Sequence, residues 1–248
     1  MDATKVHTDE KRSADDNGWR DLKVGAWFVT EAKPPQQPED PWDVEAREIS
    51  YFCDILEAEK LGPLLWATGF QRRALKAQEL IFLGDGAEWI WNLVGEYFPQ
   101  AVQIVDWFHA VEHLTPLAQA AFADEEEAHL WHEQVRTHLW EGQVDGVIAA
   151  CTALVAAGKG GEVARKTAAY FSNNRQRMNY TNYRGKGYQI GSGTIESGCK
   201  QIGTQRMKVP GATWSLEGAR RTAKARAALL SGQWDYLTAR REHLPRAA

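Results

Sequence analysis

Three acidic side chains occupy positions from which a metal site could be built. Asp2 lies in a predicted first strand, Asp85 ends a later strand, and Glu196 lies near the start of a late helix. Such distant residues can meet if their strands lie side by side, because α/β proteins build sites at the carboxyl edge of a sheet. Mg²⁺ prefers carboxylate oxygens. Two such ions, roughly 3.5–4 Å apart, activate a nucleophile and stabilise a leaving oxygen in phosphoryl transfer on DNA.

Each of the three acids also has a purely structural interpretation. Asp85 lies between Gly84 and Gly86, where an aspartate often only shapes a turn. Glu196 would be favoured in the first turn of a helix by the helix dipole. Asp2 lies beside the start of the chain. Residue types and spacing alone therefore leave the metal site and the structural roles open.

Histidines, glycines and a lysine offer further chemistry. Three histidines lie on an acid-rich helical segment: His129, His132 and His138. The chain has no CxxC or HExxH pattern, so an exposed helix face is favoured there over a zinc site. Residues 191–193 (Gly-Ser-Gly) precede a helix and suit either a phosphate cradle or a hinge. Lys200 shares a helix face with Glu196, which suits a phosphate contact or a salt bridge.

The elements that must position these residues begin with an α/β pattern. Three segments are rich in strand formers: 5–8, 22–31 and 46–53. The first two are joined by a polar turn at 9–18, and a proline-rich loop follows at 33–43. Short apolar runs predict buried strands at 79–83 and 101–105, and helical periodicity covers 54–77 and 88–97. The predicted order is β-β-β-α-β-α-β.

The remainder of the chain is predicted to be helical. No strand signal appears between Ala110 and about Asn182. A glycine-rich loop follows at 184–193, then a helix at 194–207 that carries Glu196, and a basic helix at 216–231. We therefore expect an α/β fold in three parts: a first core segment at 1–109, an all-α insertion at 110–183, and a core completion at 184–248.

Composition limits the class of protein. A chain that is 44% hydrophobic and 25% charged is typical of a globular protein. No apolar run approaches the roughly 20 residues that span a bilayer, and the opening MDATKVHTDE lacks the apolar core of a signal peptide. The three cysteines, Cys53, Cys151 and Cys199, form no CxxC pair or disulfide framework. These features favour a reducing, cytoplasmic location and exclude a membrane partner.

Charge is divided unevenly along the chain. Residues 1–157 hold 12 Lys and Arg against 28 Asp and Glu, a charge of −16, while residues 158–248 hold 17 against 5, a charge of +12. Such asymmetry suggests a basic surface for a polyanion, although the two halves could also neutralise each other in the fold. The candidate DNA-binding cations are Lys200, Arg206, Lys208, Arg220, Arg221, Lys224 and Arg226. Trp107 is a candidate for stacking on an extruded base, with core packing as the alternative.

Longer segments resemble bacterial insertion-sequence DDE transposases of the ISKra type, which share features with the Mutator-like group. GDGAEWIWNLVGEYFP (84–99) and AVQIVDWFHAVEHL (101–114) are similar to the second-aspartate block of that family. IGSGTIESGCKQIGTQRMKVPGATWS (190–215) is similar to its glutamate block. MDATKVHT (1–8) and GWRDLKVGAWF (18–28) are similar to its first-aspartate strand and hairpin. The resemblance covers essentially the whole chain.

This resemblance implies a ribonuclease-H-like mixed sheet with an all-α insertion before the glutamate-bearing helix. Asp2, Asp85 and Glu196 would be the catalytic acids and the ligands of two Mg²⁺ ions, or of Mn²⁺. They would cleave and join double-stranded DNA at the element's ends, in an active complex that is a homo-oligomer, in the nucleoid-associated cytoplasm of a bacterium. His109 would act beside them, within a motif of an acidic residue, two further residues and a histidine (106–109), contacting DNA or an acidic ligand.

Two alternatives stay open beside a transposase. Members of the family carry an N-terminal region with DNA-binding helices before the first aspartate, whereas this sequence begins one residue before Asp2. The resemblance therefore implies an N-terminally truncated copy, and an inactive remnant that only binds DNA is one alternative. The other is a ribonuclease-H-like nuclease without strand transfer.

Overall fold

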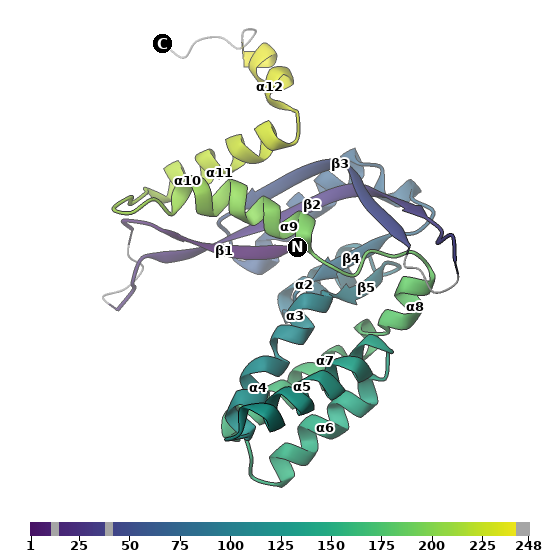
Figure 1. Cartoon of the computed structure of the whole chain (residues 1–248). Coiled ribbons are helices and arrows are strands. Elements are labelled where there is room, and N and C mark those ends of the chain that lie inside the picture. Colours follow the sequence, from purple (N-terminus) through teal and green to yellow (C-terminus); the bar gives the residue numbers. More distant parts are fainter. Residues whose placement is uncertain (11–14, 38–41, 242–248) are drawn as a thin grey trace.

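The fold is mixed α/β, as expected, and it contains two small sheets. The computed structural model describes residues 1–10, 15–37 and 42–241. Figure 1 shows the strands in one part of the molecule and a group of helices that extends away from them. Parts of the expected turn at 9–18 and of the proline-rich loop at 33–43 lie outside the described residues.

The first sheet is a three-stranded antiparallel meander. Its strands are β1 (Asp2–His7), β2 (Trp19–Lys33) and β3 (Asp43–Asp54), in the order β1-β2-β3. The three strands predicted from the sequence are confirmed, and each is longer than its run of strand formers. Asp2 pairs with Val24 of β2, so its position is fixed by the register of the first hairpin.

Both faces of β2 are covered, because successive side chains of a strand point to opposite faces. Leu22 and Val24 are buried on one face against α9 (Gly193–Cys199) and α11 (Leu216–Leu230). Trp27 belongs to the other hydrophobic cluster and donates a hydrogen bond from Nε1 to Thr68 Oγ1 over 2.9 Å. Thr68 lies on α1 (Gly62–Gln71), which has a proline in its first turn. The sheet is therefore a layer between helices.

The second sheet pairs two short parallel strands. They are β4 (Ile81–Gly84) and β5 (Val102–Val105), connected through α2 (Glu88–Tyr97), and all three elements were predicted from the sequence. Two 3₁₀ turns flank α1, at Ala58–Leu61 and Ala74–Lys76. The backbone nitrogen of Met1 donates to the carbonyl oxygen of Leu83 over 2.8 Å. This bond connects the residue before β1, the edge strand of the first sheet, to β4 of the second.

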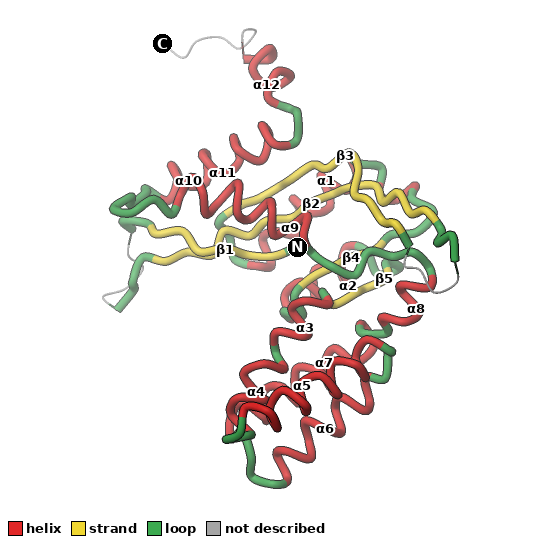
Figure 2. The backbone as a smooth tube through the Cα atoms, in the orientation of Figure 1, coloured by secondary structure: helices red, strands yellow, loops and turns green. Residues whose placement is uncertain are grey.

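A continuous run of helices follows β5, and Figure 2 shows no strand within it. The elements are α3 (Trp107–Glu112), α4 (Leu114–Ala121), α5 (Glu125–Trp140), α6 (Val144–Ala156), α7 (Gly161–Asn174), a 3₁₀ turn (Arg175–Arg177) and α8 (Tyr180–Gly185). Leu114 and Phe171 of this helical part share one hydrophobic cluster with Val105 of β5. The helical segment and the second sheet are therefore packed as one body.

The glutamate-bearing segment differs from the prediction of one helix at 194–207. α9 passes into a π-helix (Lys200–Thr204) and then a last turn, α10 (Gln205–Met207). The π-helix coincides with a close approach to β1: a Cβ atom on Gly203 would lie 2.5 Å from Thr4 Cγ2. α11 is followed by α12 (Trp234–Arg241), which points away from the sheet in Figure 1. No helix of the described residues combines the length and the apolar character needed to cross a membrane.

Candidate metal centre

Asp106, His109 and Glu196 form the group best placed to hold a metal ion. One potential ligand atom from each residue lies within 4.8 Å of the other two. Asp106 ends β5 and caps α3, where its Oδ1 accepts a hydrogen bond from the backbone nitrogen of His109 over 2.7 Å. The same oxygen lies 3.0 Å from His109 Nδ1. Within this group Asp106 is buried, His109 is half-buried and Glu196 is exposed.

Ser192 connects the two carboxylates of this group. Its backbone nitrogen donates to Asp106 Oδ2, and its hydroxyl donates to Glu196 Oε1 over 2.7 Å. The preceding loop is held to α3 as well, because the backbone nitrogen of Trp107 donates to the carbonyl oxygen of Ile190 over 2.9 Å. These bonds bring the start of α9 to the end of β5, although the two elements are far apart in sequence.

Burial and hydrogen bonding have opposite effects on the pKa values of Asp106 and His109. Burial disfavours a charged Asp106, but the hydrogen bonds from His109 and Ser192 outweigh it and hold the pKa of Asp106 below its ordinary value. The hydrogen bond to Asp106 raises the pKa of His109 to about 9 in spite of burial, and the charge of Asp2 adds to this effect. The pair with Asp106 therefore favours the protonated imidazole, and His109 would have to lose this proton to bind a metal ion directly.

Asp2 lies beside this group. It is the half-buried first residue of β1, and its Oδ1 accepts a hydrogen bond from the backbone nitrogen of Ala3 over 2.6 Å. Cys199, which follows Glu196 by three residues on α9, has its Sγ atom 3.6 Å from Asp2 Oδ2. Burial and the nearby Asp2 carboxylate raise the pKa of the Cys199 thiol. The packing of α9 on β1 therefore brings the first acid and the glutamate helix together.

Asp85 approaches from the end of β4. Its Oδ1 accepts a hydrogen bond from the backbone nitrogen of Ala87 over 2.9 Å, so the side chain has the turn-shaping role that its glycine neighbours indicated. Burial lowers the pKa of the Met1 amino group, whereas the charges of Asp2, Asp85 and Asp106 raise it. Within the described part of the chain, no contact joins Asp85 to Glu196.

The helical part holds the Asp85 turn in place. The hydroxyl of Tyr170, on α7, donates to the carbonyl oxygen of Asp85 over 2.9 Å. The Tyr170 ring fills the space in which a Cβ atom of Gly86 would lie, at 2.6 Å, and Gly86 has a φ of +97° that side chains rarely adopt. Asn174 Nδ2, one turn further along, donates to the carbonyl oxygen of Gly86 over 3.4 Å.

From the sequence, Ser192 was expected in a phosphate cradle or a hinge, and Asp106 in a motif with His109, but neither was predicted to bind a metal ion or to position a ligand. Asp106 carried the same signal as Asp85, because each follows a short apolar strand that predicts a buried position. Parallel strands end at the same edge of a sheet, and β4 and β5 are parallel neighbours. A search for acids at both strand ends would therefore have found Asp106.

Two of the predicted DNA-binding cations have a structural role. Arg220 donates from Nε and Nη2 to the two carboxylate oxygens of Asp54, over 2.6 and 3.0 Å, and Lys224 Nζ lies 2.7 Å from Asp54 Oδ2. The Asp54 side chain is only 4% exposed. Arg220 and Lys224 therefore anchor α11 to the end of β3, and their predicted role in DNA binding would have to be additional to this one.

The other predicted cations lie nearer the surface. Lys200, Arg206, Lys208 and Arg221 are exposed. The Arg206 guanidinium lies over the Trp214 ring, 5.3 Å from its centroid, and Arg221 is paired with Glu217 over 2.7 Å. Arg226 donates to the carbonyl oxygen of Gln201 over 2.7 Å. With Lys224, which is exposed although paired with Asp54, five of the predicted cations lie on the surface.

Trp107 is a core residue. Its side chain is 7% exposed and packs edge-to-face against Trp140 and Tyr180, with ring centroids 4.8 and 5.1 Å away. The prediction that Trp107 stacks on an extruded base is therefore wrong as stated, because both of these packing partners would have to move to free a face of the ring. Its exposed neighbour in sequence is Phe108, at 59%.

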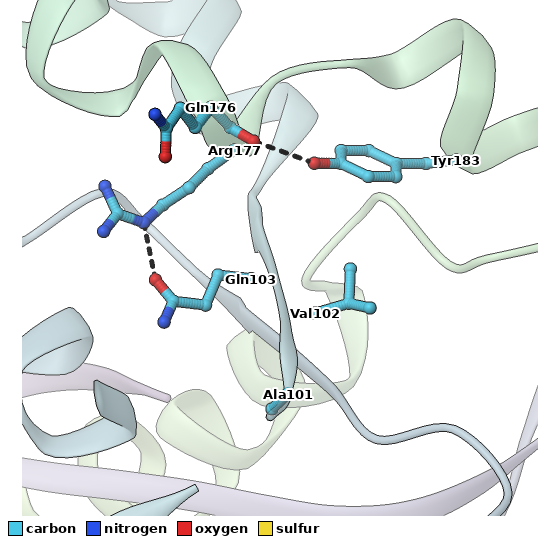
Figure 3. A pocket seen from close by; sticks show the side chains of 6 residues that line it. All are labelled: Ala101, Val102, Gln103, Gln176, Arg177 and Tyr183. Atoms are coloured by element: carbon cyan, nitrogen blue, oxygen red, sulfur yellow. Dashed lines mark hydrogen bonds between the residues drawn. The ribbon is translucent and has the colours of Figure 1, made fainter. Parts of the chain in front are cut away.

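A separate polar pocket lies at the opposite end of β5. It is lined by Ala101, Val102, Gln103, Gln176, Arg177 and Tyr183. Figure 3 shows that Arg177 is bonded to Gln103, with Nε 2.7 Å from Oε1, and that the Tyr183 hydroxyl donates to the carbonyl oxygen of Gln176. These residues already satisfy one another, and the pocket lies at the amino end of the strand whose carboxyl end leads to Asp106.

Comparison with protein-family models, with curated proteins and with solved structures gave no match. A function for this chain must therefore be argued from the residues of the site itself.

Proposed function

We propose that this chain is the catalytic part of a DNA transposase that cleaves and joins phosphodiesters with divalent cations. The observation that carries the proposal is the approach of Asp106, after β5, to Glu196 on α9, with Asp2 of β1 against Cys199 of the same helix. Asp85 follows β4, the parallel neighbour of β5. Acids from such distant segments suit metal-dependent phosphoryl transfer.

The strand arrangement supports a ribonuclease-H-like sheet. A hydrogen bond from Met1, the residue before β1, to Leu83 of β4 brings the start of β1 close to the end of β4. If the two sheets act as one, the strand order is β3-β2-β1-β4-β5, a mixed sheet with antiparallel and parallel members. The helical segment between β5 and α9 then corresponds to an insertion before the glutamate-bearing helix.

The donor set fits Mg²⁺ or Mn²⁺. Carboxylate oxygens are the preferred protein ligands of Mg²⁺, and we assign Asp2, Asp85 and Glu196 to two ions, with Asp106 as a further carboxylate. When bound, the two ions would activate a water molecule or a 3′-hydroxyl and stabilise the leaving oxygen. His109 holds Asp106 in position through Nδ1 and adds a positive charge among the acids.

The substrate in this proposal is double-stranded DNA. Lys200, Arg206, Lys208 and Arg221 supply exposed positive charge on the segment that carries Glu196 and on α11. Phosphate neutralisation dominates DNA affinity, so these side chains would give salt-dependent binding. The active complex would be a homo-oligomer that holds both ends of an element, in the nucleoid-associated cytoplasm of a bacterium.

A cleavage assay on plasmid DNA that carries the genomic flanks of the gene tests the proposal. We expect Mg²⁺-dependent nicking and joined products with the unaltered protein, and neither with Asp85→Ala or Glu196→Ala. Glu162→Ala, an exposed acid that pairs with Arg165 on α7, is the matched control and should keep full activity. Equal activity in all four proteins would remove the proposed role of the acids.

The products separate the remaining alternatives. Cleavage without joined products would indicate a nuclease, and binding of DNA without metal-dependent turnover would indicate an inactive remnant. Both outcomes contradict the transposase proposal.

A further inference from the structure

An aromatic cavity of about 420 Å³ opens beside the acid group. It is lined by Trp107, Phe108, Arg136, Thr137, Trp140 and Ile190, from α3, α5 and the loop before α9. Its volume falls within the range of small-ligand pockets, roughly 300–1,000 Å³. Phe108 lies between Asp106 and His109 in sequence, and Ile190 lies two residues before Ser192. The cavity and the metal centre therefore share the same two segments of chain.

Two aromatic rings in this cavity are accessible. Phe108 is 59% exposed and Trp140 is 40% exposed. The Phe108 ring lies against the backbone of Gly191, where a Cβ atom would be 2.9 Å from Phe108 Cε2, so only glycine allows this approach without a shift. The ring is thus held at the edge of the acid group by the same loop that delivers Glu196.

The Trp140 ring is fixed by an arginine. The Arg184 guanidinium lies 3.6 Å from the Trp140 ring centroid, and Arg184 Nη2 donates to the Trp140 carbonyl oxygen over 2.8 Å. Trp107 packs against the same ring from the core. Arg136, 48% exposed and paired with Glu133, adds a guanidinium to the cavity lining. Aromatic rings and arginines that are already ordered favour stacking on a flat ligand with little further loss of entropy.

We propose that this cavity binds one unpaired nucleobase of the DNA strand whose phosphate lies at the acid group. This inference rests on the proposed function, because it takes DNA as the substrate. A base in a duplex is stacked and inaccessible, so only an unpaired or extruded base can enter such a pocket. A base is joined to its phosphate through one sugar. The pocket meets this constraint because the Phe108 ring lies against Gly191, and the next residue, Ser192, bonds both Asp106 and Glu196.

Binding without turnover tests this proposal. Two DNA duplexes of identical sequence carry a short single-stranded thymidine extension, with bases in one and abasic sites in the other, and affinity is measured by fluorescence anisotropy with Ca²⁺ in place of Mg²⁺. We expect the protein to prefer the base-bearing extension about 10-fold, as for one stacked base. Phe108→Ala should remove this preference while leaving affinity for the blunt duplex unchanged.

Matched controls use exposed aromatic residues elsewhere. Phe70→Ala, on α1 and 67% exposed, should keep the full preference. Trp140→Ala should lose it, with thermal melting used to verify that the variant is folded. The inference is overturned if the unaltered protein binds both extensions equally, or if Phe108→Ala keeps the preference. A protein that cleaves DNA with Mg²⁺ but shows no preference overturns this inference alone, whereas a base preference without cleavage overturns only the proposed activity.

Discussion

Nδ1 of His109 lies 3.0 Å from Oδ1 of Asp106, and the two residues are three apart at the start of one short helix. The geometry of the helix cap therefore fixes the pair, since the same carboxylate oxygen accepts the backbone nitrogen of His109. Asp106 is buried, and His109 is its charged partner within the described residues.

His109→Ala should lower the free energy of unfolding by about 1–3 kcal/mol, because it removes a charged hydrogen-bond partner from a buried carboxylate. Urea unfolding at neutral pH measures the change. His132→Ala is the control, since His132 pairs with a partly exposed Glu133 and should change stability by less than about 1 kcal/mol. Equal effects of the two variants would show that the Asp106 pair contributes no more than a surface pair.

Ser192→Ala should weaken Mn²⁺ binding by about 10-fold, because residues that orient metal ligands contribute at this level. The variant keeps the backbone bond to Asp106 and loses only the hydroxyl bond to Glu196. Calorimetric titration with Mn²⁺ provides the measurement. Ser197→Ala removes a hydroxyl from the same helix, where it accepts from Gln201, and should leave Mn²⁺ affinity unchanged. Unaltered affinity in Ser192→Ala would contradict a positioning role for this hydroxyl.

Arg220→Met and Arg221→Met should have opposite consequences. Arg220→Met removes two bonds from the buried Asp54 and should cost about 1–3 kcal/mol of stability, moderated by the remaining Lys224. Arg221→Met should leave stability nearly unchanged and weaken DNA binding with a shallower salt dependence. Melting curves and salt titrations of DNA binding separate the two effects. Loss of DNA affinity confined to Arg220→Met, at full stability, would reverse this assignment.

The ion pairs of Asp54 should make the free energy of unfolding decrease at low pH. Burial opposes its ionisation, but the hydrogen bonds from Arg220 and Lys224 outweigh burial and hold the pKa of Asp54 below its ordinary value of 3.8. The folded pKa is depressed, so this contribution is present above pH 3.8 and is lost as the pH falls through the folded pKa. The stability difference between the unaltered protein and Asp54→Asn should therefore be large at pH 7 and shrink below pH 4. A difference independent of pH would contradict the ion-pair origin.

The sequence predicted the elements better than the contacts between them. β4, α2 and β5 follow from local signals, because short apolar runs and helical periodicity are encoded within about ten residues. The pairing of Asp54 with Arg220 joins residues 166 positions apart, and no local pattern records it. The local pattern therefore predicted a basic helix face but not that two of its cations pair with Asp54.

In the candidate site, too, single residues could be predicted from the sequence, but contacts between distant elements could not. Of the residues selected from the sequence, His109 and Glu196 lie together with Asp106, and Asp2 lies beside them, whereas Asp85, among the described residues, makes no contact with Glu196. The π-helix at 200–204 was not predicted, because its wide turn occurs where Gly203 passes over Thr4 of another element. Hydrophobic periodicity in a sequence assumes a regular helix, so it contains no information about a contact with another element.

Tyr170 connects the group of helices to the turn that carries Asp85. Its hydroxyl donates to the carbonyl oxygen of Asp85 and its ring packs against Gly86, while α7 itself belongs to the helices that extend from the sheets. With Asn174, which bonds the carbonyl oxygen of Gly86, Tyr170 makes α7 the support of the backbone that carries Asp85. A substitution on α7 can therefore displace this acid without touching it.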